Sequence, residues 1–460
     1  MGNAVVSCQV SPGSESDLSL GVKFGYGVGD FAFNLVLQST SLFLIYFFTD
    51  VFLIGAAAAG AIVLVSKLWD AVTDPLMGVL SDHTHSRWGK KRPYLLFGAL
   101  PFGLSIFLLF LAPELSTTGK VIYGFLTFIL FSTAITVVNI PYGALTAVLT
   151  PDAQARSRLT AFRMTFALIG TLAAAGATKP LVGLAATELQ GFRMVGGLYG
   201  IIAVGFTLIS FASVRERIEE QAPQRETLRS YLRVVFANPP LLFLALATFL
   251  FMTAINMMAA VVNYYFKYNL SAEGLTPVAF LALFATAAFC IPLFVWISNR
   301  RSKRFAFALG MGFLGLLLIP LYLCGEASTV LTLGIFVAAG LGMSTIYLCP
   351  WSMIPDTVEY SEWKTGLRME GILYGAFFFC FKAGAALAGA LVGLGLDLSG
   401  YQANVAQTAR ALAGIRILIS LVPLGFIVLG VIVIRFYSIT AEKHRQIVAE
   451  IHARRTPATR

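Results

Sequence analysis

The chain has 460 residues, of which 57% are hydrophobic and only 12% are charged. That charged fraction is roughly half of what soluble domains carry, and apolar runs of about 20 residues recur along the whole length. Each run can cross a bilayer core as a helix, so the composition excludes a soluble globular fold. The five cysteines lack metal-ligand spacing, and the sequence predicts neither a disulfide framework nor a metal site.

Twelve membrane helices are predicted, which makes the fold all-α and integral to the membrane. The segment before them, residues 1–17, lacks the features of a signal peptide, so the first helix is expected to serve as its own signal. The predicted helices lie near residues 24–48, 52–80, 94–113, 120–149, 159–185, 191–213, 240–266, 275–297, 305–324, 328–354, 367–396 and 411–436.

The basic residues in the loops, in the tail and near the ends of these helices sort to one side of the predicted membrane. Twelve spans place both termini on one side, which receives 24 Lys and Arg residues against five on the other. The positive-inside rule then predicts cytoplasmic termini in a bacterial-type inner membrane. The formal charge of +10 therefore reflects topology, and neither nucleic acid nor an obligatory protein partner is predicted.

The longest polar connection, residues 215–232, separates two blocks of six predicted helices. The blocks resemble each other weakly, because the second and eighth helices both run into basic loops. Two six-helix pseudo-repeats around a central cavity predict a major facilitator fold. The predicted organisation is an N-terminal half at 1–214, a central cytoplasmic loop at 215–236, a C-terminal half at 237–437 and a cytoplasmic tail at 438–460.

Two acidic residues on the second predicted helix are the strongest functional candidates, because a charge at mid-span costs about 2.5–3.5 kcal/mol on insertion scales. Asp70 and Asp74 share one helix face, with Thr73 beside them and Lys67 one turn earlier. A bound cation or a shared proton relieves the repulsion between two close carboxylates. This pattern predicts a coupling site for H+ or Na+ and no other cofactor; the alternative is a structural ion pair with Lys67.

Polar groups on the first and fourth predicted helices suit a ligand with many hydroxyls. Tyr26, Asp30 and Asn34 line one face of the first helix, and Asn139 precedes a stretch, residues 140–143, that is expected to interrupt the fourth. Each hydroxyl of such a ligand needs a partner in a dry cavity. The alternative role for the two amides is hydrogen bonding between helices.

Two cations and one loop complete the set of candidates. Arg163 and Lys382 lie deep in the fifth and eleventh spans, where each either balances a carboxylate or holds an anionic group of a substrate. The loop at 78–92 resembles the loop that gates the cytoplasmic face of major facilitator transporters, and its histidines are interpreted as parts of a polar turn. Its predicted gating residues are Asp82, Arg87, Lys90, Lys91 and Arg92.

Five ordered motifs carry a resemblance that covers nearly the whole chain. The chain resembles the glycoside-pentoside-hexuronide:cation symporter family, which contains the melibiose and glucuronide permeases, and the glucuronide permease is the closer likeness. The motifs are YGVGDFAFN at 26–34, WDAVTDPLMG at 69–78, SRWGKKRPYLL at 86–96, VNIPYGAL at 138–145 and DTVEYSEWKTGLRMEG at 356–371.

The resemblance also implies which residues bind each ligand. Family members that use sodium commonly have Asn where this chain has Thr73, and both acids of the sugar site have become amides here. The site keeps its cations and loses its anions, which favours an anionic substrate such as a glucuronide, with a neutral pentoside as the alternative. The implied cation ligands are Asp70, Thr73, Asp74 and Thr136, and the implied substrate ligands are Asn34, Asn139, Arg163, Tyr347 and Lys382, to which Asp30 is added.

These observations predict a secondary transporter that moves a sugar and a cation together by alternating access. Its expected partners are a small glycoside and membrane lipid. A lipid carrier of the same superfamily is a more remote alternative, which the amides argue against. An enzyme is not predicted, because the sequence has no HExxH, GxSxG or paired His and acidic cluster, and the short tail argues against a sensor.

Overall fold

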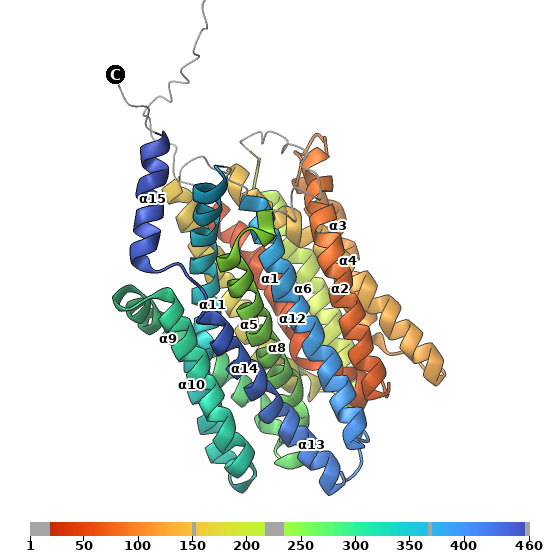
Figure 1. Ribbon diagram of the computed structural model, residues 1–460. Helices are drawn as coiled ribbons and strands as arrows, with labels where there is room; N and C mark the ends of the chain where they lie inside the picture. Colours follow the sequence, from red (N-terminus) through yellow and green to blue (C-terminus); the bar gives the residue numbers. More distant parts are fainter. Residues whose placement is uncertain (1–18, 150–152, 217–233, 367–369, 456–460) are drawn as a thin grey trace, which may run out of the picture.

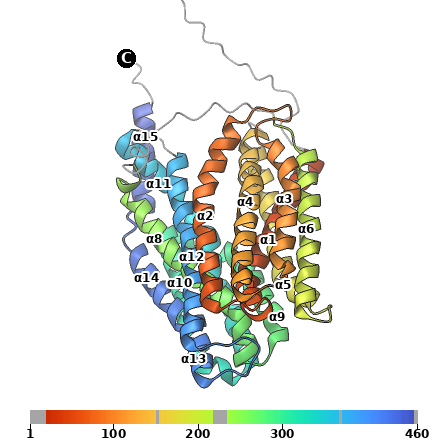
Figure 2. The same ribbon diagram turned by 90° about the vertical axis from the view of Figure 1, so that its right-hand side faces the viewer.

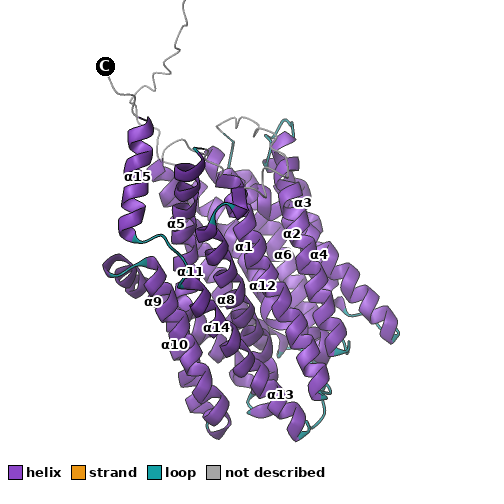
Figure 3. Cartoon of the chain, in the orientation of Figure 1, coloured by secondary structure: helices purple, strands orange, loops and turns teal. Residues whose placement is uncertain are grey.

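The computed structural model describes residues 19–149, 153–216, 234–366 and 370–455. Within these ranges the regular structure is helical and no strand is present (Figure 3). Several ranges used above lie partly outside the described part of the chain, namely residues 1–17, most of the central loop, residues 367–369 of the last motif and residues 456–460 of the tail.

The main helices follow one another with short connections (Figure 1). Their bounds are α1 (Leu20–Tyr46), α2 (Ala56–His83), α3 (Arg92–Leu111), α4 (Thr117–Leu149), α5 (Ala153–Val182), α6 (Glu188–Ser213), α8 (Pro239–Tyr264), α9 (Thr276–Arg300), α10 (Lys303–Cys324), α11 (Thr329–Thr365), α12 (Glu370–Ser399), α13 (Ala409–Ile419), α14 (Leu421–Ile434) and α15 (Ala441–Arg455).

Among the described residues, twelve helical segments are long and apolar enough to cross a membrane. This confirms the predicted all-α membrane fold, and most helix bounds lie within about four residues of the expected ones. Side chains cap several of the helices: Ser19, Thr187, Ser328 and Thr408 accept a hydrogen bond from a backbone amide in the first turn of α1, α6, α11 and α13.

Three expectations about helix continuity were wrong. Helix α4 runs without interruption through Pro141, and α11 passes through Pro350 and Pro355 to Thr365, eleven residues beyond the expected end. Helix α5 begins six residues earlier than expected. Proline is tolerated inside membrane helices because neighbouring helices satisfy the freed backbone groups. The tail also contains a helix, α15, which packs against α11.

The helices pack so that the two predicted halves meet along a few pairs. Helices α2 and α12, α5 and α9, and α1 and α8 form these contacts, and Figure 2 shows α2 beside α12. We call residues 19–216 the N-terminal half and residues 234–455 the C-terminal half. The distal end is the end of the bundle opposite α15, where α1 finishes and α9 begins (Figure 1).

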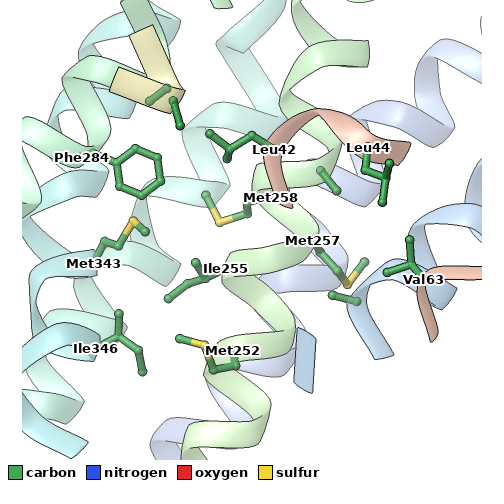
Figure 4. Packing of buried hydrophobic residues seen from close by; sticks show 14 of the residues in the cluster. Leu42, Leu44, Val63, Met252, Ile255, Met257, Met258, Phe284, Met343 and Ile346 are labelled. Atoms are coloured by element: carbon green, nitrogen blue, oxygen red, sulfur yellow. The ribbon is translucent and has the colours of Figure 1, made fainter. Parts of the chain in front are cut away.

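An apolar core fills the interface between the halves near the distal end. Figure 4 shows Leu42, Leu44 and Val63 of the N-terminal half close to Met257 and Met258 of the C-terminal half. Unbranched methionine side chains adapt to irregular gaps between helices. The contacts between the halves are therefore dispersive and adaptable, apart from the polar groups described below.

Candidate functional site

Asp74 of α2 connects the two halves. Its Oδ1 atom accepts a hydrogen bond of 2.8 Å from the Thr136 hydroxyl on α4, and its Oδ2 atom forms an ion pair with the Lys382 ammonium on α12. The Lys382 side chain is 31% exposed and that of Asp74 is 18% exposed, so water reaches this pair. A cation that neutralised Asp74 would therefore weaken a contact between the halves.

Asp70 lies one turn before Asp74 and is buried. Its Oδ2 atom pairs with the Lys67 ammonium at 3.5 Å. The structural ion pair that was the alternative for Lys67 therefore forms, although the contact is long. The predicted ligand Thr73 donates from its hydroxyl to the Trp69 carbonyl at 3.0 Å, within its own helix. The structure thus brings together Asp70, Asp74 and Thr136, while the Thr73 hydroxyl is bonded to the backbone.

Asp30 forms the second charged cluster with Arg163. Arg163 donates to the two Asp30 carboxylate oxygens at 2.6 and 3.1 Å, and the Tyr142 hydroxyl donates to the same carboxylate at 2.7 Å. The guanidinium also lies 5.2 Å from the ring centroid of Tyr26 and 4.9 Å from that of Tyr142. Arg163 therefore balances Asp30 in this conformation, which was one of its two predicted roles.

The remaining predicted substrate ligands are spread along the bundle. Asn34 donates to the Asp30 carbonyl at 2.8 Å within α1 itself, which is neither a contact with substrate nor the hydrogen bond between helices that was the alternative, and Asn139 is half-buried on α4. Tyr347 of α11 is 43% exposed. No hydrogen bond joins Asn139 or Tyr347 to the charged clusters within the described residues, so their roles stay predictions.

A small cavity of about 50 Å³ lies between the halves and shares Lys67 with the pair at Asp70. Helices α1, α2, α4, α8 and α12 line it, and its polar walls come from Thr40, Ser41, Lys67 and Asn256. Sequence reasoning missed Thr40, Ser41 and Asn256. Asn256, an amide within an apolar span, was the signal that could have found the site.

The predicted gating loop is held by a residue that the sequence did not indicate. The Glu216 carboxylate accepts hydrogen bonds from the backbone amides of Lys90, Lys91 and Arg92 at 2.7–3.0 Å. The Asp82 carboxylate lies 3.7 Å from the Lys91 ammonium. The loop is thus attached to the segment that follows α6. Among the described residues, no group of three His, Cys, Asp or Glu is suited to a metal ion.

The Arg and His side chains of the loop are bound locally. The Arg87 guanidinium lies 4.1 Å from the ring centroid of Trp88, and Arg92 donates to the Phe211 carbonyl at 2.9 Å. His83 contacts the Val79 carbonyl at 2.8 Å in its own helix. His83 is therefore the last residue of α2 and does not lie in the expected polar turn, which begins after it.

A polar network joins the halves at the distal end. Lys179 of α5 pairs with Glu188 at 2.8 Å and, across the halves, with Glu273 at 2.5 Å. The buried Asp50 carboxylate pairs with Lys267 of the C-terminal half at 3.1 Å and accepts a hydrogen bond from Tyr401. In this conformation, these contacts hold the distal end closed.

Tyr401 lies in the loop between α12 and α13. Burial raises the pKa of the Tyr401 phenol, and the neighbouring Asp50 charge raises it further. The phenol therefore remains a neutral hydrogen-bond donor to Asp50 at physiological pH.

Apolar helices with charged groups inside them define a multi-pass membrane protein, and the family it matches makes it a transporter and not an enzyme. The family described as MFS/sugar transport protein matches residues 25–441, and the chain belongs to this family, that of the glycoside-pentoside-hexuronide:cation symporters. The chain is therefore a cation-coupled sugar transporter of a bacterial inner membrane; the family does not identify the particular sugar.

Similar proteins cover the chain almost end to end. The uncharacterized symporter YnaJ of Bacillus subtilis (strain 168) is 36% identical over 95% of this chain and 96% of its own. The glucuronide carrier protein homolog of Escherichia coli (strain K12) is 33% identical over 94% and 95%, and the isoprimeverose transporter of Lactiplantibacillus pentosus is 33% identical over 91% and 88%.

A solved structure supports the fold alone. A point mutant of the nucleoside transporter NupG aligns with a TM-score of 0.68 at 13% identity, covering 91% of this chain and all of that one.

Proposed function

We propose that the protein imports an acid-bearing glycoside of the hexuronide class together with a cation, by alternating access. The observation that carries this proposal is the ion pair between Lys382 of the C-terminal half and Asp74 of the N-terminal half. A cation that neutralises Asp74 releases Lys382, and the released ammonium can then bind the acid group of a substrate.

The charges of the candidate site support an anionic substrate. Three carboxylates face three cations in pairs: Asp30 with Arg163, Asp70 with Lys67, and Asp74 with Lys382. A monovalent cation and a monoanionic sugar add no net charge to this arrangement. A cation with a neutral sugar adds one charge, which costs several kcal/mol in a low-dielectric interior.

A neutral glycoside is the second candidate, and one observation favours it. Arg163 already forms two hydrogen bonds with Asp30, so only Lys382 is available to an acid group without breaking a buried pair. The similar proteins do not decide between the two candidates, because the glucuronide carrier homolog and the isoprimeverose transporter are equally identical to this chain.

The test is uptake of a radiolabelled aryl glucuronide and an aryl xyloside into membrane vesicles. Proton and sodium gradients are imposed separately, with vesicles lacking the protein as the baseline. Glucuronide accumulation driven by either gradient supports the hexuronide proposal. Accumulation of the xyloside alone would overturn it and leave Lys382 a structural partner of Asp74.

A further inference from the structure

A histidine of the tail helix contacts two carboxylates of α11. The Nε2 atom of His444, on α15, is hydrogen-bonded to the Glu359 carboxylate and lies 3.5 Å from the Oδ1 atom of Asp356. The His444 and Glu359 side chains are 30% and 28% exposed, whereas that of Asp356 is 9% exposed. Helix α15 lies beside the end of α11 that is opposite the distal end, so this contact attaches the tail to the bundle (Figures 1 and 2).

The charges of this cluster balance only when the imidazole carries a proton. Lys303, the first residue of α10, places its Nζ atom 2.8 Å from each carboxylate oxygen of Asp356 and donates to the Ser352 carbonyl at 2.7 Å. With a neutral imidazole, the cluster holds one ammonium and two carboxylates. Protonation of His444 adds a second positive charge next to both acids, so that each carboxylate faces a cation.

The imidazole differs from its charged neighbours in the pH range over which it titrates. Among the described side chains of the packed segments, His444 is the one whose type ordinarily changes charge between pH 6 and 8. Lysine, arginine and tyrosine ordinarily titrate above this range, and aspartate and glutamate titrate below it. Besides the two acids, the charged or titratable groups there are Lys303 and Arg304 of α10, Tyr360, Glu362 and Lys364 of α11, Tyr437 of the connection before α15, and Glu442, Lys443 and Arg445 of α15.

The rest of the contact between α15 and α11 is small. Within the described part of α15, the buried hydrophobic side chains are Ile447 and Ile451, at 2% and 8% exposure. Trp363 of α11 donates through its Nε1 atom to the Glu450 carboxylate at 2.6 Å. Docking must offset the conformational freedom that a helix of 15 residues and its connection lose. The balance between docked and free α15 is therefore close enough for one added charge to change it.

We propose that His444, Asp356 and Glu359 form a proton-binding site that docks α15 on α11. The docked imidazole faces two carboxylates, whereas the imidazole of a free α15 faces water, so the docked form binds the proton more tightly. By linkage, docking then strengthens as the pH falls through the titration of the imidazole and weakens as the pH rises. The site lies at the end predicted to face the cytoplasm, is separate from the acids of α2, and goes beyond the proposed function.

The experiment measures the distance between α15 and the start of α10 as a function of pH. Spin labels are attached at Ala449→Cys and Arg301→Cys, two exposed positions, in the full-length protein without native cysteines. Electron–electron double resonance in lipid nanodiscs gives the docked and free populations between pH 6 and pH 8. We expect the ratio of docked to free α15 to rise at least about threefold from pH 8 to pH 6, within the limit of about tenfold per pH unit for one proton.

Matched variants separate the charge of His444 from its packing. His444→Gln stays neutral, so its ratio should be the same at pH 6 and pH 8 and no higher than that of the wild type at pH 8. His444→Lys stays charged and should remain docked at both pH values. Ile447→Ser removes the buried apolar contact and should free α15 at both, which calibrates the measurement. His85→Gln, at an exposed loop position, should keep the wild-type pH response.

Three outcomes would overturn the proposal. They are equal populations of docked α15 at pH 6 and pH 8 in the wild type, a pH response that survives in His444→Gln, and a free α15 in His444→Lys at pH 8. Glu359→Gln removes one of the two carboxylates and should reduce the pH response; an unchanged response would contradict its part in the site. The distances are measured without substrate or an ion gradient, so the result does not depend on the proposed function.

Discussion

Asp74 receives a hydrogen bond from its own half and an ammonium from the other, so its charge state affects both. We expect Asp74→Asn to reduce uphill accumulation to less than about a tenth of the wild-type level. The neutral amide cannot exchange an ion pair with Lys382 for a bound cation. Exchange of labelled for unlabelled substrate should persist. Uptake and counterflow in proteoliposomes measure the two activities.

The control for this variant is Asp397→Asn, which removes an exposed carboxylate near the distal end of α12 and should transport normally. Uphill accumulation at the wild-type level by Asp74→Asn would contradict the coupling role. Loss of exchange as well as accumulation would mean that Asp74 contributes directly to substrate binding.

The pair of Asp30 and Arg163 makes a second prediction, this time about stability. Removing one partner of a buried ion pair leaves an uncompensated charge and costs about 3–5 kcal/mol. Asp30→Asn should therefore lower the melting temperature markedly, and adding Arg163→Gln should recover a large part of the loss. Thermal denaturation of Asp30→Asn, of Arg163→Gln and of the double variant checks this, and a loss in the double variant equal to the sum of the two single losses would show that the two charges are not coupled.

Sequence reasoning selected the right residue types, and only the structure shows how they pair. The carboxylates and cations were found because charge is rare inside spans, a constraint that a single sequence displays directly. Whether Arg163 would meet Asp30 or a helix-two acid depended on contacts between helices far apart in the chain.

Helices α2 and α12 touch closely at the distal end. A Cβ atom added to Gly60 would lie 2.7 Å from the Gly389 carbonyl oxygen and 2.9 Å from the Gly393 Cα. Only glycine allows this approach, and the polar network around Asp50 and Lys267 closes at the same end. A larger residue at position 60 should therefore hold the distal end open.

We expect Gly60→Val to reduce transport at least about tenfold while exposing the cavity from the distal side, predicted to face outward. A cysteine at Asn256, which lines the cavity, reports this in a background without native cysteines. Labelling of intact cells by an impermeant maleimide should rise severalfold. Gly205→Val, where an added Cβ meets no atom within 4 Å, is the matched control, and unchanged labelling of Gly60→Val would contradict the close contact as a gate.

The helices themselves were predicted well because the bilayer leaves the backbone few choices. Every N–H and C=O in the hydrocarbon core must be satisfied within the segment, so apolar length predicts a helix directly. Proline was given too much weight at residue 141, where the chain stays helical. Helix α15 was expected only as a short basic, partly amphipathic segment, because its apolar face is no wider than Ile447 and Ile451, which are four residues apart and buried.

At the scale of the whole molecule, the contacts between the halves describe one of the two arrangements that alternating access requires, the one in which the distal end is closed. The orientation of the termini remains a prediction from the distribution of the basic residues. The six-helix repeat remains a prediction from the weak similarity between the two blocks of helices. What the pairing of Asp74 and Lys382 adds is a thermodynamic link, since any ligand that favours separation of the pair assists the other ligand.

This link is reciprocal, which makes it measurable from either side. If the cation releases Lys382 for the substrate, it must lower the substrate Kd by the same factor by which the substrate lowers the Kd of the cation, about 5–150-fold for a coupling of 1–3 kcal/mol. Isothermal titration of an aryl glucuronide with and without Na⁺, and of Na⁺ with and without the glucuronide, gives both factors. In Asp74→Asn, Lys382 lacks its carboxylate partner from the start, so the glucuronide should bind tightly without Na⁺ and the factor should fall toward one. A factor of one in the wild type would contradict the link, and a factor that survives in Asp74→Asn would place the coupling in contacts other than the pair between the halves.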